Sequence, residues 1–182
     1  KEGLEPVSML PEDMTVQDQE SDSFLKYYSK DQKRPKEKKI RAFQIRRKKK
    51  DGNHLHVHES VVSVKEVLKR SRELGVSMTV FLTAVFLKAI HEEMSKMQEK
   101  KPIVLMVPVN LRKFFPSTSM LNFFNWIEPG YDFSKRDRSF EEVLRYTKDF
   151  FEEQLTKEKM SAHINDLLAL ELHPILRLAP LE

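Results

Sequence analysis

The fold is decided by two apolar stretches with a loop between them, Ile103-Val-Leu-Met-Val-Pro-Val109 and Leu121-Asn-Phe-Phe-Asn-Trp-Ile127. A short, continuous apolar run is typical of a strand that is covered on both faces. We therefore predict that the first stretch is a central strand and that the second is its neighbour, ended by the turn pair Pro129-Gly130. Both are predicted to be inner strands of one sheet.

Helical patterns lie on both sides of the two strands. Upstream, Ser63-Val-Lys-Glu66 has the spacing of a capping box, and Gly75 suits the end of the helix that it opens. A second helix is predicted over about 77–97, and because its middle is apolar nearly all round, we expect burial on several sides. Downstream, Ser139-Phe-Glu-Glu142 opens a third helix, and a fourth covers about 159–170.

The first third of the chain is polar. Residues 1–23 are acidic and aperiodic, which predicts a loop or an extended strap. Residues 40–45 alternate weakly, His54-Leu-His-Val-His58 alternates clearly, and turn-forming Lys50-Asp-Gly-Asn53 lies between them. A β-hairpin is therefore predicted over about 39–60.

The predicted order of elements is hairpin, two helices, strand, strand, helix, helix. This order indicates an α/β (α+β) fold in which a mixed β-sheet is packed with helices. The strands are too few to close a sheet, so unpaired edges and uncovered apolar faces are expected to favour a homodimer or strand swapping. The chain begins without Met and stops just after an apolar segment, so we expect a fragment of a larger protein.

Positive charge is concentrated in one segment. Between Lys26 and Lys50 there are 13 Lys or Arg and two acids, a net charge of +11, whereas the whole chain carries +4 and the remainder therefore −7. Lysine clusters bind phosphates, but the few aromatic residues in this run lack the spacing of a nucleic-acid recognition motif. A solvated linker is the favoured interpretation, nucleic acid is not favoured, and coenzyme phosphates stay an open alternative.

Residue types also bound the chemistry. The chain has no cysteine, which excludes disulfides, thiol nucleophiles and thiolate metal sites, and fits a cytoplasmic location. His54, His56 and His58 share one face of a predicted strand, but without further ligands we interpret them as solvent-facing side chains and predict no metal site. No apolar run reaches the roughly 18 residues that cross a bilayer.

Polar residues follow the first predicted strand and interrupt the second. Asn110 and Arg112 come at the strand exit, where functional groups tend to gather. Asn122 and Asn125 flank two aromatic residues that we expect to be buried, and an asparagine in an apolar strand needs hydrogen-bond partners. These four are the candidate site residues, and satisfying loop backbone groups is the alternative role.

The order and spacing of these stretches resemble the superfamily of chloramphenicol acetyltransferase, the alcohol acetyltransferases and the condensation domains of nonribosomal peptide synthesis. The nearest likeness is to the bacterial alcohol acetyltransferase-like branch. The similarity runs from about His54 to the end and rests on four stretches: Val61 to Lys69, Gly75 to Ala84, Pro108-Val-Asn-Leu-Arg112 and Asn122-Phe-Phe-Asn125. It implies part of a chloramphenicol acetyltransferase-like two-subdomain fold, with residues 1–53 as a connecting segment that holds part of the hairpin and 54–182 as the first part of the second subdomain.

The resemblance also implies an activity. Members transfer an acyl group from coenzyme A or a carrier protein to an alcohol or amine, in a tunnel between two subdomains. The histidine of a His-x-x-x-Asp motif acts as the general base. No such motif occurs in this chain, so it is expected in a missing N-terminal subdomain. The chain alone is therefore predicted to be inactive, with no catalytic residue and no permanently bound cofactor, and with acyl-CoA as a cosubstrate.

Roles for the four candidate residues follow from the same resemblance. Arg112 resembles the family arginine that pairs with the motif aspartate, so it is expected to support the shape of the active site, with Asn110 beside it, and to be unpaired here. Asn122 and Asn125 are expected near the tunnel wall. The alternative to an acyltransferase fragment is a non-catalytic interaction module or a degenerate family member.

Overall fold

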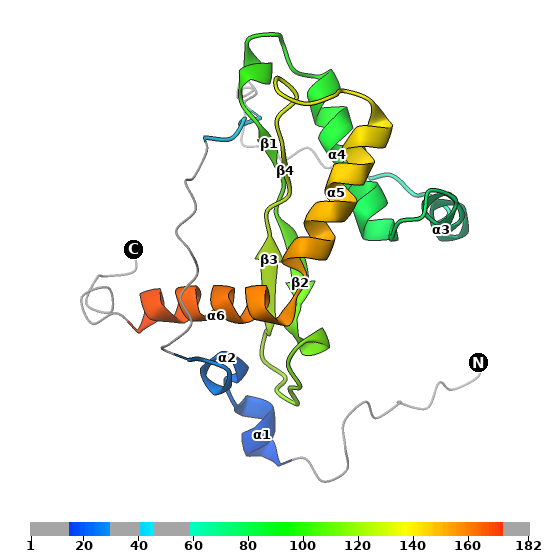
Figure 1. Cartoon of the computed structure of the whole chain (residues 1–182). Coiled ribbons are helices and arrows are strands. Elements are labelled where there is room, and N and C mark those ends of the chain that lie inside the picture. The colour runs from blue at the N-terminus through cyan, green and yellow to red at the C-terminus, as the bar shows by residue number, and fades with distance from the viewer. Residues whose placement is uncertain (1–14, 30–40, 46–58, 173–182) are drawn as a thin grey trace, which may run out of the picture. The chain divides into compact units, whose positions relative to one another are not determined.

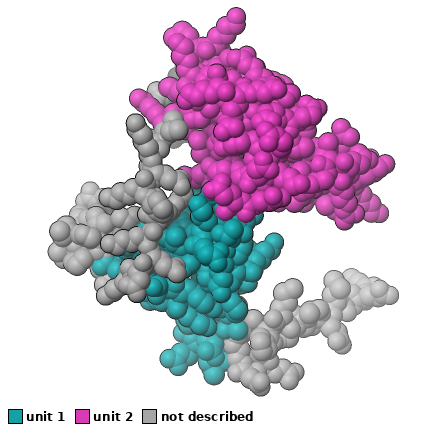
Figure 2. Space-filling view, in the orientation of Figure 1, with its two compact units in different colours: residues 1–36, 108–127, 154–182 teal, residues 37–107, 128–153 magenta. Residues whose placement is uncertain are grey.

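The computed structural model of the protein describes residues 15–29, 41–45 and 59–172 (Figure 1). Two compact units are drawn from separate stretches of the chain (Figure 2): unit 1 from 1–36, 108–127 and 154–182, and unit 2 from 37–107 and 128–153. About 52% of the described residues are helical and the strands form small antiparallel sheets, so the predicted mixed α/β class is confirmed. The division predicted at residues 53 and 54 stays a prediction.

The elements follow the predicted order closely. The described helices are α1 (Val16–Glu20), α2 (Ser23–Lys26), α3 (Val64–Glu73), α4 (Met78–Glu92), α5 (Phe140–Gln154) and α6 (Lys157–Glu171), with short 3-10 turns η1 (Gln98–Lys100) and η2 (Leu111–Lys113). The described strands are β1 (Ile103–Val104), β2 (Val107–Asn110), β3 (Phe124–Ile127) and β4 (Gly130–Tyr131). They form two separate two-stranded ladders, β1 with β4 and β2 with β3, so β2 and β3 are neighbouring strands as predicted. The prediction of inner strands in one sheet is wrong for the described residues, because each ladder has only two strands and β1 pairs with β4 instead.

Helix starts agree with the predicted capping residues. The Ser63 hydroxyl accepts from the Glu66 N–H at 3.4 Å, and the Ser139 hydroxyl accepts from the Glu142 N–H at 3.4 Å. Each contact satisfies one of the backbone donors that a helix leaves free in its first turn. The end of α3 is also as predicted, because Gly75 follows it with a φ of +67°, a conformation that glycine adopts without steric cost.

The prediction that α4 is buried on several sides is wrong. Its buried residues recur at helical spacing and share one face: Val80, Thr83, Ala84, Leu87 and His91. The opposite face exposes apolar side chains, and Phe86 is 60% exposed. In the described residues α4 packs on α3 and β1, and a helix covered in this way is protected along one stripe only. It also ends at Glu92, several residues before the predicted end near Met97.

The stretch 103–109 is not one strand covered on both faces. It forms two short strands, and burial alternates along it: Ile103 is buried, whereas Val104 and Met106 are exposed. A two-stranded ladder covered by helices on one side shows this alternation, which a continuous apolar run does not reveal in advance.

Pro129-Gly130 is not a turn. Gly130 lies in β4, where it pairs antiparallel with Val104. A Cβ atom at position 130 would lie 3.1 Å from Cγ2 of Val104, so the close approach of these two strands favours glycine.

Part of the predicted N-terminal loop is helical. Thr15 and Asp18 form a full capping box on α1: the Thr15 hydroxyl accepts from the Asp18 N–H and the Asp18 carboxylate accepts from the Thr15 N–H, both at 3.2 Å. Asp22 caps α2 by accepting from the Phe24 N–H at 2.8 Å. The prediction of an aperiodic loop through residue 23 was therefore wrong, although the signal was the same spacing that located α3 and α5.

The predicted hairpin at 39–60 lies mostly outside the described residues. Residues 41–45 form no regular strand, but the Phe43 N–H donates to the Pro102 carbonyl at 2.8 Å, next to β1. In the described part of the chain, no single helix is both long and apolar enough to cross a membrane, and only α3 and α4 together pass such a test, with an 89° bend between them.

Candidate functional site

The loop between β2 and β3 holds the candidate residues, and it is closed by its own backbone and side chains. The Asn110 side chain accepts from the Arg112 N–H at 3.0 Å and so begins η2. The Leu111 N–H donates to the Phe123 carbonyl at 3.3 Å, across the ends of the two strands. Leu111 and Phe115 are buried and anchor the loop to unit 1. The structure therefore brings Asn110 and Arg112 together, as predicted.

Arg112 closes the loop. Its Nη2 donates to the Ser119 carbonyl at 2.7 Å and to the Leu121 carbonyl at 2.8 Å. The guanidinium carbon also lies 6.0 Å from the centre of the Phe123 ring, within the range of a cation–π contact. Both acceptors are backbone carbonyls, which Nη2 satisfies at once with its two hydrogens. The expectation that Arg112 lacks its aspartate partner stays a prediction. Its role in supporting an active site stays a prediction.

Asn122 and Asn125 lie in different environments. Burial alternates along this stretch, so Asn122 is exposed and Asn125 is completely buried, with Phe123 buried and Phe124 half exposed between them. The expectation of two buried aromatic residues is therefore half correct. The Asn125 carbonyl oxygen accepts from the Trp126 N–H at 2.8 Å, but its Nδ2 has no hydrogen-bond partner among the described residues. Of the two, Asn122 alone is positioned to meet a ligand from solvent.

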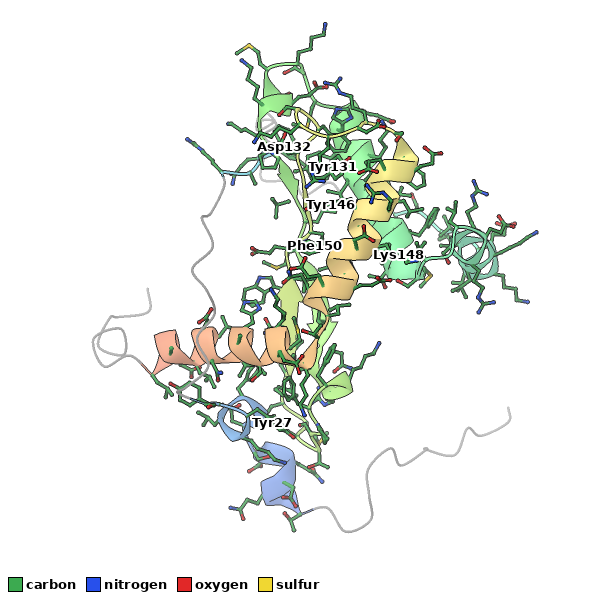
Figure 3. The ribbon with its side chains drawn as sticks, in the orientation of Figure 1. Tyr27, Tyr131, Asp132, Tyr146, Lys148 and Phe150 are labelled. Carbon is green, nitrogen blue, oxygen red and sulfur yellow. The ribbon has the colours of Figure 1, made fainter. Side chains whose placement is uncertain are left out.

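The sequence did not indicate which distant residues hold this loop. Gln19, Ser23 and Tyr27, from α1, α2 and the residue after α2, bond to loop residues 116–120. Tyr27 points from the end of α2 toward the loop (Figure 3). The capping signals at Thr15 and Asp22 would have located the helices, but no spacing rule pairs residues that lie about a hundred positions apart.

Unit 2 contains a second polar cluster that the sequence did not indicate. His91 is 8% exposed, and its Nε2 lies 3.1 Å from Oε1 of Glu99, whose Oε2 accepts from Arg138 at 2.9 Å. The imidazole stacks on Phe133, with ring centres 3.9 Å apart. Nδ1 is buried and has no partner among the described residues, so neither ring nitrogen is open to a substrate. We interpret this cluster as structural.

Aromatic side chains in unit 2 form a layer along α5. Tyr131 and Tyr146 meet edge to face at 5.2 Å, and Phe150 follows at 6.4 Å from Tyr146 (Figure 3). Burial raises the pKa of the Tyr131 hydroxyl, which donates to the Asp137 carbonyl at 2.6 Å. Arg136 covers the Tyr146 ring at 4.3 Å. We interpret this layer as structural, because the Tyr131 hydroxyl is used within it and the rings pack on one another.

Metal binding finds no support in the part of the chain that the structure describes, where no three His, Asp or Glu side chains are grouped to share an ion. His54, His56 and His58 lie outside the described residues, and so does most of the Lys26–Lys50 run. The interpretations given for both stay predictions.

A comparison with protein-family models decides the family. The model of the alcohol acetyltransferase family matches residues 6–158. The chain belongs to the alcohol acetyltransferase family. The resemblance to the alcohol acetyltransferases is therefore confirmed, but its predicted bounds, from about His54 to the end, are not. Within this alcohol acetyltransferase family member the match begins well before His54, takes in α1 and α2, and ends at residue 158. No curated protein and no solved structure matches the chain.

The matched stretch of this alcohol acetyltransferase family member includes the loop between β2 and β3. Asn110, Arg112 and Asn122 all lie inside the matched stretch, as do the α1 and α2 residues that bond to the loop. The polar loop and the segment that holds it therefore both lie inside the stretch that the family model matches. Dependence on coenzyme A and a cytoplasmic location stay predictions.

Proposed function

We propose that this chain provides part of the acyltransferase machinery that moves an acyl group from coenzyme A or an acyl carrier to an alcohol or amine. The family match over residues 6–158 carries the proposal. The chain supplies tunnel wall and support for the active site, and the general base comes from an N-terminal subdomain of the same protein. The sequence supports this division, because no histidine in it is followed by an aspartate four positions later.

The loop between β2 and β3 supplies the support in this proposal. Arg112 binds the carbonyls of Ser119 and Leu121. These bonds hold the backbone directly before exposed Asn122 in one conformation. A rigid wall matters because small displacements of a bound acyl group or alcohol reduce the rate strongly. Exposed apolar side chains flank Asn122, namely Met120, Leu121 and Phe124, and they favour an acceptor with an apolar chain.

Thiol release from acetyl-CoA tests the proposal. We expect no free thiol above background from the 182-residue chain, and acetyl transfer to a primary alcohol from the native protein that carries His-x-x-x-Asp upstream of Lys1. Turnover by the 182-residue chain alone would contradict the assignment of the base. Absence of the motif from the upstream reading frame, together with an inactive native protein, would favour the alternative.

The alternative is a non-catalytic interaction module, and the outward face of α4 favours it. Met78, Leu82 and Val85 recur at helical spacing, are all exposed, and lie next to exposed Phe86. A stripe of this kind is typical of a surface that another protein covers, and a second copy of this chain is the occupant that we propose. Light scattering should then give a mass near twice 21.5 kDa at high concentration, and the monomer mass would contradict it.

A further inference from the structure

We propose that the segment Thr15–Ser29 is a clamp that positions Arg112, with Ser119 as the residue that joins the two. The proposal rests on the proposed function, in which Arg112 supports the active site. Ser119 and Tyr27 are positioning residues in it, because neither is required to touch a substrate. The clamp lies about ninety residues before the loop in sequence, yet both belong to unit 1 and to the matched family stretch.

Ser119 connects the clamp to Arg112 through two of its own groups, its carbonyl and its hydroxyl, which make three hydrogen bonds. Its carbonyl accepts from Nη2 of Arg112 at 2.7 Å, and its hydroxyl donates to the Gln19 carbonyl at 3.2 Å. The same hydroxyl accepts from the Leu121 N–H at 3.2 Å. Leu121 is the residue whose carbonyl takes the second Arg112 bond. The serine is 5% exposed, so water cannot easily replace a partner that it loses.

Further bonds hold the rest of the loop against the clamp. The Met120 N–H donates to the Gln19 carbonyl at 2.8 Å, so Gln19 accepts from two consecutive loop residues. The Ser23 and Ser117 hydroxyls lie 2.5 Å apart, and the Tyr27 hydroxyl donates to the Pro116 carbonyl. The loop is therefore fixed along residues 116–120, a stretch that includes Ser119 and ends beside Leu121, the two residues whose carbonyls Arg112 binds.

Aromatic side chains also connect the clamp to Arg112. Phe24 meets Phe123 edge to face at 5.1 Å, and Tyr27 stacks on it at 6.0 Å with 17° between the rings. Phe123 also has Arg112 as a neighbour, 6.0 Å from its ring centre. A change in the clamp should therefore reach Arg112 through Phe123 as well as through Ser119.

The clamp is itself anchored on α6. The Ser29 N–H donates to the Asn165 side-chain oxygen at 2.8 Å, and α2 packs against α6 (Figure 1). Asn165 is buried, so this contact ends the clamp at a rigid helix rather than at a second loop. The capping box of Thr15 and Asp18 orders the other end. A segment fixed at both ends can hold the loop in one position.

Two conservative variants test the clamp in the 182-residue chain. Ser119→Ala removes the hydroxyl but keeps the carbonyl that Arg112 binds, and Tyr27→Phe keeps the ring but removes the bond to Pro116. We expect amide hydrogen exchange at Met120 and Leu121 to become about 3–10 times faster, in line with the loss of one hydrogen bond. The side-chain NMR signal of Arg112 should broaden or shift, and Ser119→Thr should restore it.

Matched controls separate the clamp from a general loss of stability. Tyr28→Phe changes a neighbouring tyrosine whose hydroxyl bonds nothing in the described residues, and Ser134→Ala removes an exposed loop hydroxyl in unit 2. Both should leave exchange at Met120 and the Arg112 signal unchanged. If Ser119→Ala and Tyr27→Phe also leave them unchanged, the clamp does not hold Arg112, whatever the activity.

The kinetic measurement is made in the native protein that also carries the general base. There, Ser119→Ala should lower kcat several-fold with KM little changed, because the support is lost while the substrate contacts remain. A looser loop with unaltered kcat would overturn the positioning role, because Arg112 would then not matter to the reaction. Failure of the proposed function is a different result: no acyl transfer by the unmodified protein.

Discussion

The contacts described inside unit 1 and those described inside unit 2 are of different kinds. In unit 1, hydrogen bonds join side chains that are 94 positions apart at Ser23 and Ser117, and a backbone N–H to a side chain 136 positions away at Ser29 and Asn165. In unit 2, the buried stripe of α4 packs on β1 and α3. The apolar packing of unit 2 leaves a periodic trace in the sequence. The polar contacts of unit 1 leave no such trace, because the sequence does not distinguish a serine that bonds a distant residue from a serine in an ordinary loop.

Leu87 tests the apolar side of this comparison and has the largest expected effect. The residue is completely buried on the inner stripe of α4. Leu87→Ala should lower the free energy of unfolding by about 2–5 kcal/mol, because apolar contacts are lost and a cavity is left. Val85→Ala, on the outward face of the same helix, should cost less than about 1 kcal/mol. Denaturant unfolding measures both, and equal costs would mean that the outward face is buried in solution.

Glu99 tests whether unit 2 also depends on polar contacts. Glu99→Leu removes the acceptor of both His91 and Arg138 and leaves a buried imidazole N–H unsatisfied. We expect a loss of about 1–3 kcal/mol in thermal or denaturant unfolding. Glu99→Gln keeps one acceptor oxygen and should cost less, and exposed Glu92→Ala serves as the control. A cost near zero for Glu99→Leu would make unit 2 purely apolar and sharpen the contrast with unit 1.

Thr15 tests whether helix capping contributes to unit 1. Thr15→Ala removes the hydroxyl, which accepts from the Asp18 N–H and donates to the Asp18 carboxylate, and leaves the backbone N–H of residue 15 as a donor to Asp18. The local stability of α1 should fall by about 0.5–2 kcal/mol, because a helix donor loses its acceptor. Amide exchange at Asp18 measures this loss. As a control, Thr79→Ala, at an exposed position of α4, should change the exchange at Asp18 little. If α1 is unaffected, the clamp is held by the loop rather than by its own helix.

How much the sequence could predict depended on this same difference. The capping serines Ser63 and Ser139 and the neighbouring strands β2 and β3 were located correctly, since each is a local pattern. The exposure of the outward face of α4 was not predicted, because a helix that is apolar on all sides carries no sequence signal for which side is covered. The partners of Ser119 were missed because they come from α1 and α2, far away in sequence.

Acid should loosen α1, and this effect is the smallest. The Thr15 hydroxyl and then the Thr15 N–H donate to Asp18 and lower the pKa of its carboxyl. Because this pKa is lower in the folded than in the unfolded state, the contribution is complete at neutral pH. It is lost only as the pH falls below about 4. NMR of Asp18 against pH measures the midpoint, which should vanish in Asp18→Asn. A midpoint above about pH 5 would contradict the cap.

The outward face of α4 has a practical consequence for handling the protein. Its apolar side chains are exposed in the native fold, so self-association does not require unfolding. Salts that salt out hydrocarbons should then strengthen retention on a phenyl column, and a single charge at Phe86 should weaken it while the melting curve stays in place.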